Sequence, residues 1–270
     1  SFAQEIIKLT AKKIKEIGYE VIYQDTDSCF VDTNLTKEKA NQLGKKIEKD
    51  INKFYEEYVK KHHKRESYLE LELEKQYLSF IIPQLRGTKK QDQDSTTSSG
   101  AKKRYAGLKE IKKQEKGKTM IKEKIEVVGM EAIRGDWTDA AQEFQINLLD
   151  KIFHKQEPIK FIKQYILDLR NGKLDKKLVY RKSIRKNLSE YTKTTPPHVK
   201  AARKLKKLDS NIIQYYITTE GPEPIQNLTH SIDYEHYIKK QIQPIAIQIL
   251  SLLGVEFEDI IKGSKQATLF

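Results

Sequence analysis

Two acidic residues, Asp25 and Asp27, are separated by a single residue inside an otherwise apolar stretch of the chain. The stretch reads YQDTDSCFVD, from Tyr23 to Asp32, and both of its flanks are rich in the β-branched and aromatic residues that favour strands. Two strands joined through QDTDS predict a tight hairpin with the acids at its tip. Because side chains alternate across a strand, both carboxylates are expected on the same side. Carboxylates held that close repel each other unless a cation lies between them.

The residues alone leave two explanations of this pair open. Asp, Thr and Ser are common turn residues because their side chains hydrogen-bond to nearby backbone amides, so the acids can simply form a turn. Alternatively, the carboxylates bind a divalent metal, which prefers oxygen ligands. A calcium EF-hand loop is excluded, because the sixth position from Asp25 is Phe30 and the twelfth is Thr36. Thr26 and Ser28 are expected to hold the hairpin rather than to react.

Composition narrows the class of protein. The chain has 270 residues, 51 Lys and Arg against 38 Asp and Glu, and a net charge of +13. This excess favours a polyanionic partner, either nucleic acid or an anionic membrane surface. No apolar run is long enough to cross a membrane, and we expect no signal peptide before the first residues. A single cysteine, Cys29, excludes a disulfide framework and suits a reducing cytoplasm.

Positive charge is concentrated between Lys173 and Lys207, where 13 Lys and Arg are accompanied by two acids. One explanation is a solvated helix face, which charge runs usually form. Tyr180, Tyr191 and a TTPPHV stretch interrupt the run with aromatic and turn residues, however. This mixture favours a rigid phosphate-binding surface for nucleic acid.

The pattern of apolar residues predicts the elements that must position these groups. We expect a helix over residues 1–17, the acidic hairpin, a helix over 36–63, a strand over 68–83 with one wet face, a polar loop over 87–103, and two strands over 104–129. From Asp136 the pattern becomes helical, which places a boundary near Gly135. The predicted fold class is α+β.

Several motifs, in the same order along the chain, resemble those of family B DNA polymerases. They are YQDTDS at 23–28, KKRYAGL at 102–108, GMEAIRGDWTDAAQEFQ at 129–145, LVYRKSIRKNLSEY at 178–191 and TTPPHVKAARKL at 194–205. IIPQLRG, TTEGPEP, IDYEHYIKKQIQPIA and QATLF resemble the bacterial members of the family. The resemblance implies the C-terminal half of a palm, an antiparallel sheet with packed helices, over residues 1–135. It further implies a mostly helical thumb over 136–262 and a flexible tail over 263–270.

The resemblance also implies template-directed nucleotidyl transfer by two Mg²⁺ ions, one activating the primer 3′-hydroxyl and one clamping the nucleoside triphosphate. The second Asp of DTDS corresponds to Asp27, which is expected to bridge the metals as a catalytic ligand. Asp25 is expected to support the same site. Glu74 is expected to lie on the wet face of a strand rather than to serve the metals.

The KKRY motif lies against the primer–template duplex in the family. Lys102, Lys103 and Arg104 are therefore expected to contact phosphates or the minor groove, and Tyr105 to pack beside the terminal base pair. Minor-groove acceptors are nearly the same for every base pair, so such contacts check geometry without reading sequence. The remaining DNA-binding candidates all lie in the expected thumb: Arg181, Lys182, His198, Lys200, Arg203 and Lys204.

The ending QATLF resembles the motif by which bacterial polymerases bind the sliding clamp. Gln266 is expected to hydrogen-bond the rim of the clamp pocket, and Leu269 and Phe270 to fill its apolar cleft. The alternative is an ordinary frayed terminus.

Other parts of the family pattern are missing. There is no DFxSLYP-like motif, which would carry the partner metal-binding Asp, and no KxxxNSxYG-like motif, which would bind the incoming triphosphate. We therefore expect the C-terminal part of a longer DNA-directed DNA polymerase that acts in the cytoplasm in DNA repair or replication restart, inactive by itself. The alternative is a non-catalytic module that binds DNA and the clamp and keeps a relict palm hairpin.

Overall fold

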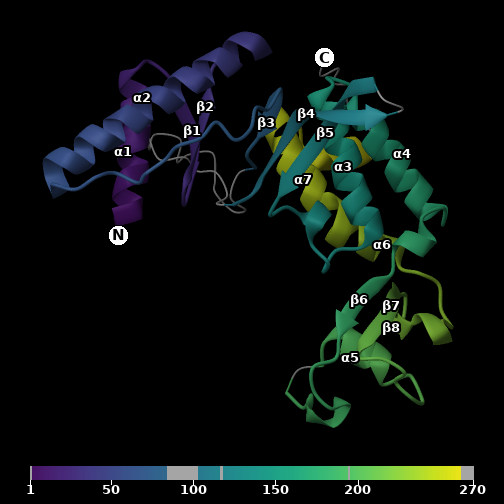
Figure 1. The fold of residues 1–270 in the computed structure, drawn as a ribbon. Helices are drawn as coiled ribbons and strands as arrows, with labels where there is room; N and C mark the ends of the chain where they lie inside the picture. The colour runs from purple at the N-terminus through teal and green to yellow at the C-terminus, as the bar shows by residue number, and fades with distance from the viewer. Residues whose placement is uncertain (1, 84–102, 116–117, 194, 263–270) are drawn as a thin grey trace. The chain divides into compact units, whose positions relative to one another are not determined.

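The structure is a computed structural model that describes residues 2–83, 103–115, 118–193 and 195–262 (Figure 1). It divides into two compact units, which are described separately below. The first unit is Ser1–Lys103 with Gly107–Glu126, and the second is Arg104–Ala106 with Val127–Phe270. Both are built of helices and small sheets, which confirms the α+β class. Four residues with predicted functions lie outside the described residues: Lys102, Gln266, Leu269 and Phe270.

The first unit begins with two helices and a hairpin. Its elements are α1 (Phe2–Glu16), β1 (Glu20–Asp25), β2 (Ser28–Asp32) and α2 (Lys37–His63), in agreement with the predicted helices and hairpin. The helix α1 stops before Gly18, whose φ of +98° suits a residue without a Cβ. β1 and β2 pair antiparallel, with Asp25 opposite Ser28.

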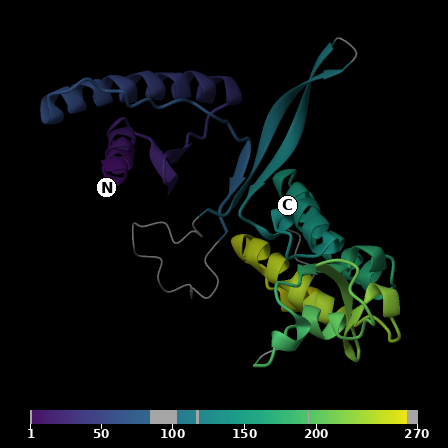
Figure 2. The ribbon, with the colours of Figure 1, turned by 60° about the horizontal axis from the view of Figure 1, so that its bottom comes forward.

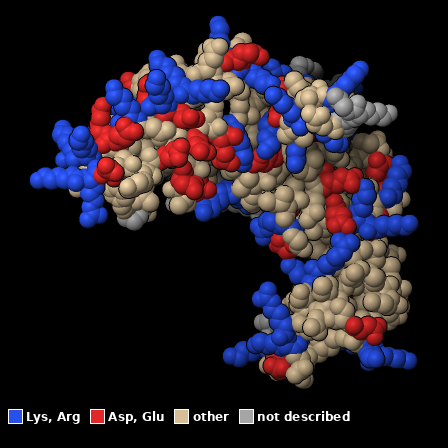
Figure 3. All heavy atoms as spheres, in the orientation of Figure 1, with Lys and Arg blue, Asp and Glu red and all other residues tan. Residues whose placement is uncertain are grey.

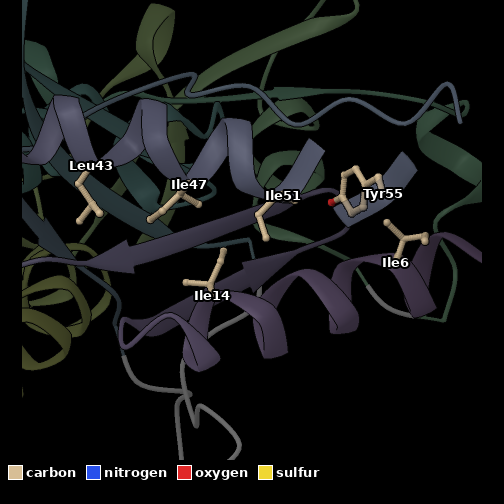
Figure 4. Packing of buried hydrophobic residues seen from close by; sticks show 6 residues of the cluster. All are labelled: Ile6, Ile14, Leu43, Ile47, Ile51 and Tyr55. Atoms are coloured by element: carbon tan, nitrogen blue, oxygen red, sulfur yellow. The ribbon is translucent and has the colours of Figure 1, made fainter. Parts of the chain in front are cut away.

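An apolar core joins α1 and α2 across one face of the hairpin (Figure 4). It consists of Ile6, Ile14, Leu43, Ile47, Ile51 and Tyr55. The α2 members recur every four residues, so they share one face of the helix. Alternate hairpin residues pack against this core, among them Val21, Cys29 and Val31. The core therefore fixes the hairpin on the two helices.

The predicted strand over residues 68–83 is wrong for most of its length. Only β3 (Ser79–Ile81) is a strand, and residues 68–77 are extended without a neighbouring strand. Side chains of α2 bind the backbone instead: Asn52 Oδ1 accepts from Leu71 N at 2.7 Å, and Glu48 Oε2 accepts from Leu73 N at 2.8 Å. The alternation of apolar residues is real, but it faces a helix rather than completing a sheet.

A second sheet contains β3, β4 (Tyr105–Glu115) and β5 (Lys118–Val128), in the order β3-β4-β5. The two long strands form the predicted hairpin (Figure 2). Phe30 of β2 stacks on Phe80 of β3 at 5.0 Å between ring centroids and on Tyr77 at 6.4 Å. A Cβ at Gly107 would lie 2.2 Å from the Tyr77 ring, so this position of β4 requires glycine.

The second unit is helical, with one small antiparallel sheet in the order β6-β7-β8. Its longest helices are α3 (Asp139–Phe153) and α4 (Pro158–Arg170), which contact each other, and α3 also contacts α7. The sequence predicted the helices but not the sheet. The other elements are η2 (Glu131–Ile133), η3 (Asp175–Lys177), β6 (Tyr180–Ser183), η4 (Leu188–Glu190), α5 (Pro197–Ala202), β7 (Ile212–Thr218), β8 (Gly221–Pro224), η5 (Ile225–Asn227), α6 (Tyr234–Tyr237), η6 (Ile238–Ile242), α7 (Gln243–Leu250), η7 (Ser251–Leu253) and α8 (Phe257–Lys262).

Candidate functional site

The two acids lie at the tip of the first hairpin, as predicted. Asp25 ends β1, whereas Asp27 lies in the turn before β2, so strand alternation does not govern this pair. Asp25 Oδ1 accepts hydrogen bonds from Thr26 N at 2.8 Å and from Thr26 Oγ1 at 3.2 Å. Asp27 Oδ1 accepts one from Ser28 Oγ at 3.0 Å. Each acid thus supports the turn with one oxygen, and its second oxygen has no hydrogen-bond partner among the described residues.

The hairpin tip offers part of a metal site. Two carboxylates supply the hard oxygen ligands that divalent ions prefer, and Asp27 is exposed to solvent. No group of three or more His, Cys, Asp or Glu in the described part of the chain could hold a metal ion. The donor atoms therefore suit a divalent ion, but a complete coordination shell needs ligands that these residues do not supply.

Within the first unit, Lys103 of the KKRY motif lies beside the acidic tip. The backbone N–H of Lys103 donates to the hydroxyl of Tyr23, 80 residues earlier, at 2.6 Å. Lys103 Nζ lies 3.9 Å from Asp25 Oδ1, and its side chain is 68% exposed. Lys103 has a positive φ of 57°, which turns the backbone at this point. A cation that can reach phosphate therefore stands beside the acids.

Arg104 has different surroundings in the second unit. Its Nη2 donates to Glu131 Oε1 at 2.5 Å and to Gln248 Oε1 at 3.1 Å. The sequence predicts a DNA contact here, whereas the structure directs the guanidinium toward a buried carboxylate. Tyr105, which follows, is half-buried at the start of β4.

The basic segment Lys173–Lys207 contains two kinds of cation. Three predicted DNA-binding residues have partners inside the second unit. Arg181 Nη1 pairs with both oxygens of Asp139 at 2.9 and 3.1 Å, and Lys204 Nζ lies 3.2 Å from Glu223. Arg203 Nη2 donates to the carbonyl oxygens of Leu188 and Tyr191 at 2.7 and 3.1 Å.

Between Lys182 and Lys207, seven other cations have no carboxylate partner among the described residues. Lys182 is half-buried and the rest are exposed. Figure 3 shows Lys and Arg side chains projecting from the part of the unit that holds β6, β7, β8 and α5. These cations can bind phosphate without first breaking an ion pair. They are Lys182, Arg185, Lys186, Lys193, Lys200, Lys206 and Lys207.

His198 lies among these cations in α5. Partial burial, together with the nearby charge of Lys182, lowers the pKa of His198 from its ordinary value. Its ring meets that of Tyr191 edge to face at 6.5 Å between centroids. His198 can therefore donate a hydrogen bond as a neutral imidazole and gain a proton when an anion binds beside it.

Sequence reasoning missed the buried acid Glu223, which orders this region. Its carboxylate accepts hydrogen bonds from Thr229 N at 2.8 Å and from His230 N at 3.1 Å, besides pairing with Lys204. Burial alone would raise the pKa of Glu223, but the hydrogen bonds from Thr229 and His230 outweigh it and lower that pKa strongly. Glu223 lies between two prolines in β8, and its neighbours in the sequence do not indicate that it is buried.

Enzymes that transfer phosphoryl groups commonly hold their divalent cations with carboxylates. The comparison with known families identifies the group: the chain belongs to DNA polymerase family B, which matches residues 1–92 and 100–253. The match includes both units and the DTDS and KKRY motifs.

Individual relatives agree with this family. The chain is similar to DNA polymerase II of Escherichia coli, with 36% identity over 96% of this chain and 32% of the relative. It is 28% identical to DNA polymerase 2 of Aeropyrum pernix over the whole chain and 30% of that protein. It is also 28% identical to a DNA polymerase of Methanocaldococcus jannaschii, over 96% of this chain and 15% of that relative. The chain thus spans a third or less of these relatives.

No helix in the described ranges of the chain is long and apolar enough to span a membrane.

Proposed function

We propose that this chain supplies part of a DNA-directed DNA polymerase, with the first unit as half of the palm and the second as the thumb. The observation that carries this proposal is the acidic tip, where Asp25 and Asp27 lie together with Lys103 beside them. The family assignment supports it. The substrates would be primer–template DNA and deoxynucleoside triphosphates.

In this proposal the residues of the tip have different roles. Asp27, the more exposed acid, and Asp25 would be ligands of two divalent ions, most simply Mg²⁺, which activate the primer hydroxyl and neutralise triphosphate charge. The partner acid would come from a part of the polymerase outside this chain. Hydrogen bonds to Thr26 and Ser28 hold each carboxylate in place before substrate binds. Lys103, next to Asp25, would bind a DNA phosphate or a minor-groove acceptor.

The unpaired cations of Lys173–Lys207 would hold the duplex. Phosphate contacts of this kind release counterions and do not depend on base sequence. Among the predicted contacts, Lys182, His198 and Lys200 would reach DNA most readily. Arg181, Arg203 and Lys204 are expected to shape the surface first, because each already has partners within the unit.

The test is Asp27→Asn in a complete polymerase that contains this chain. The change nearly keeps the shape but removes a metal-binding charge, so turnover should fall by about three orders of magnitude or more while duplex binding stays. Asp25→Asn is the matched comparison and should cost less. Near-normal turnover of Asp27→Asn with Mg²⁺ would mean that the acids only stabilise the turn. It would favour the alternative function, a non-catalytic DNA-binding module.

The ending QATLF supports a further partner, the bacterial sliding clamp. A short peptide should bind such a ring weakly, on the order of micromolar, because few side chains contribute and the peptide must be ordered. Tethering to a ring on DNA would still raise processivity, which suits synthesis in repair or replication restart. Titrating the clamp with the chain and with its Leu269→Ala, Phe270→Ala variant tests this. Equal binding by the two would remove the tail from the mechanism.

A further inference from the structure

A buried polar network of the second unit surrounds Arg104, the third residue of KKRY. Glu131 of η2 accepts the guanidinium at 2.5 Å through Oε1, and accepts Gln145 Nε2 at 2.9 Å through Oε2. Gln145 of α3 in turn accepts from Ala132 N at 2.6 Å, and Gln248 of α7 also accepts from Arg104. The network therefore ties the start of β4 to η2, α3 and α7.

The centre of this network is a charged, fully buried acid. Burial alone would raise the pKa of Glu131, but hydrogen bonds from Gln145 and Arg104 outweigh it and hold that pKa below its ordinary value. Removing one partner of a buried ion pair leaves the other charge uncompensated, which is strongly destabilising. Arg104 is thus committed to Glu131 and cannot turn to a phosphate without that cost.

Lys103 and Arg104 are neighbours in the chain but differ in what they can reach. The side chain of Lys103 is 68% exposed, whereas that of Arg104 is 20% exposed. An exposed lysine can exchange water for phosphate with little loss. The arginine can influence DNA only through the backbone position that it gives to the residues beside it.

We infer that Arg104 is a positioning residue, held by Glu131, that presents Lys103 to the duplex. This inference rests on the proposed function, in which KKRY lies against DNA. It makes an unusual prediction for Glu131, a residue too deeply buried to touch DNA. Removing an acid normally tightens binding to a polyanion because repulsion falls. Removing this acid should weaken binding, because Lys103 loses its support.

The experiment measures duplex affinity of the 270-residue chain against salt concentration. Glu131→Gln should weaken binding and reduce the slope of log affinity against log salt by roughly one unit, the contribution of one phosphate contact. Lys103→Gln should do the same, and the double variant should lose no more than either single one. Glu220→Gln, which neutralises an exposed acid of the same unit, is the matched control and should bind as tightly as the parent chain or tighter.

A second variant keeps the test valid if Glu131→Gln does not fold. Arg104→Lys preserves the charge, so a direct phosphate contact would survive it. A positioning role would not, because both hydrogen bonds come from Nη2, and the ammonium of a lysine ends one bond short of that nitrogen. The slope should therefore fall with this variant as well.

Three results would overturn the inference. They are unchanged or tighter binding by Glu131→Gln, additive slope losses for Glu131→Gln and Lys103→Gln, and an unchanged slope for Arg104→Lys. With normal binding by the unaltered chain, these results would leave the proposed function standing. Absence of salt-dependent duplex binding by the unaltered chain would remove the proposed function and the inference together.

Discussion

The acidic hairpin tip of the first unit and the basic segment of the second unit differ in how their charged side chains are divided between internal contacts and solvent. At the tip, Asp25 and Asp27 each give one oxygen to the turn and keep one oxygen available. In the basic segment, some cations such as Arg203 already donate hydrogen bonds within the unit, while others such as Lys200 have no carboxylate partner in the described residues.

The difference shows what each region needs from elsewhere. The tip has too few ligands in the described residues to complete a metal site, so the catalysis that we propose would need acids from another segment. The phosphate binding that we propose for the basic segment would need no further protein ligands, since internal partners such as Glu223 already hold part of it in place. Binding should therefore survive in this chain by itself, whereas catalysis should not.

The interaction between Tyr23 of β1 and Lys103 should make a measurable contribution to the stability of the first unit. Tyr23→Phe removes the hydroxyl that accepts the Lys103 N–H. Leaving a half-buried donor unsatisfied costs about 1–3 kcal/mol of unfolding free energy. Urea unfolding measures this loss.

Tyr19→Phe is the control for that change, because the Tyr19 hydroxyl has no hydrogen-bond partner within the described residues. Its effect should stay within about 0.5 kcal/mol. Equal stabilities for the two variants would mean that the hydroxyl of Tyr23 does not hold the backbone of Lys103.

The salt dependence of duplex binding should distinguish the cations of the basic segment that have internal partners from those that have none. Lys182→Gln with Lys200→Gln should lower the slope of log affinity against log salt by roughly two units, because two phosphate contacts are lost. Arg203→Gln with Lys204→Gln removes the same charge, yet should mainly lower the unfolding temperature. Equal slope losses for the two pairs would contradict the distinction drawn from their internal partners.

The smallest effect should be a pH dependence at His198. Its pKa in the folded chain lies below the ordinary value of 6.5, so its contribution to stability is present above that value and is lost as pH falls. A bound phosphate offsets the charge of Lys182 and favours the protonated ring. Duplex affinity should therefore rise modestly as pH falls below about 6.5. The rise should disappear in His198→Gln, and its persistence would assign the protons to another group.

Local sequence rules predicted the elements whose patterns are self-contained. The four-residue recurrence in α2 and the apolar flanks of DTDS gave the right helix and hairpin. The prediction of a strand over most of residues 68–83 failed because side chains of α2, rather than a neighbouring strand, bind the backbone there. The hydrogen bonds with Asn52 and Glu48 that do this are visible only in the tertiary structure.

The site was predicted from motifs, and the motifs gave residue identities without their partners. Nothing in KKRY distinguishes Lys103 from Arg104, because both are basic and adjacent. The distinction comes from Glu131, which is 27 residues further along the chain and ordinary in sequence. Long-range pairs of this kind have no local signature, so only the folded structure separates cations with internal partners from those without.

One measurement tests the central claim most directly: duplex binding and primer extension by the same purified 270-residue chain, in Mg²⁺ with all four deoxynucleoside triphosphates. We predict binding that weakens steeply with salt and is indifferent to base sequence, together with no extension of the primer. Extension by this chain, free of contaminating polymerase, would contradict the view that the acidic tip depends on ligands from elsewhere. Absence of salt-dependent binding would contradict the role given to the basic surface.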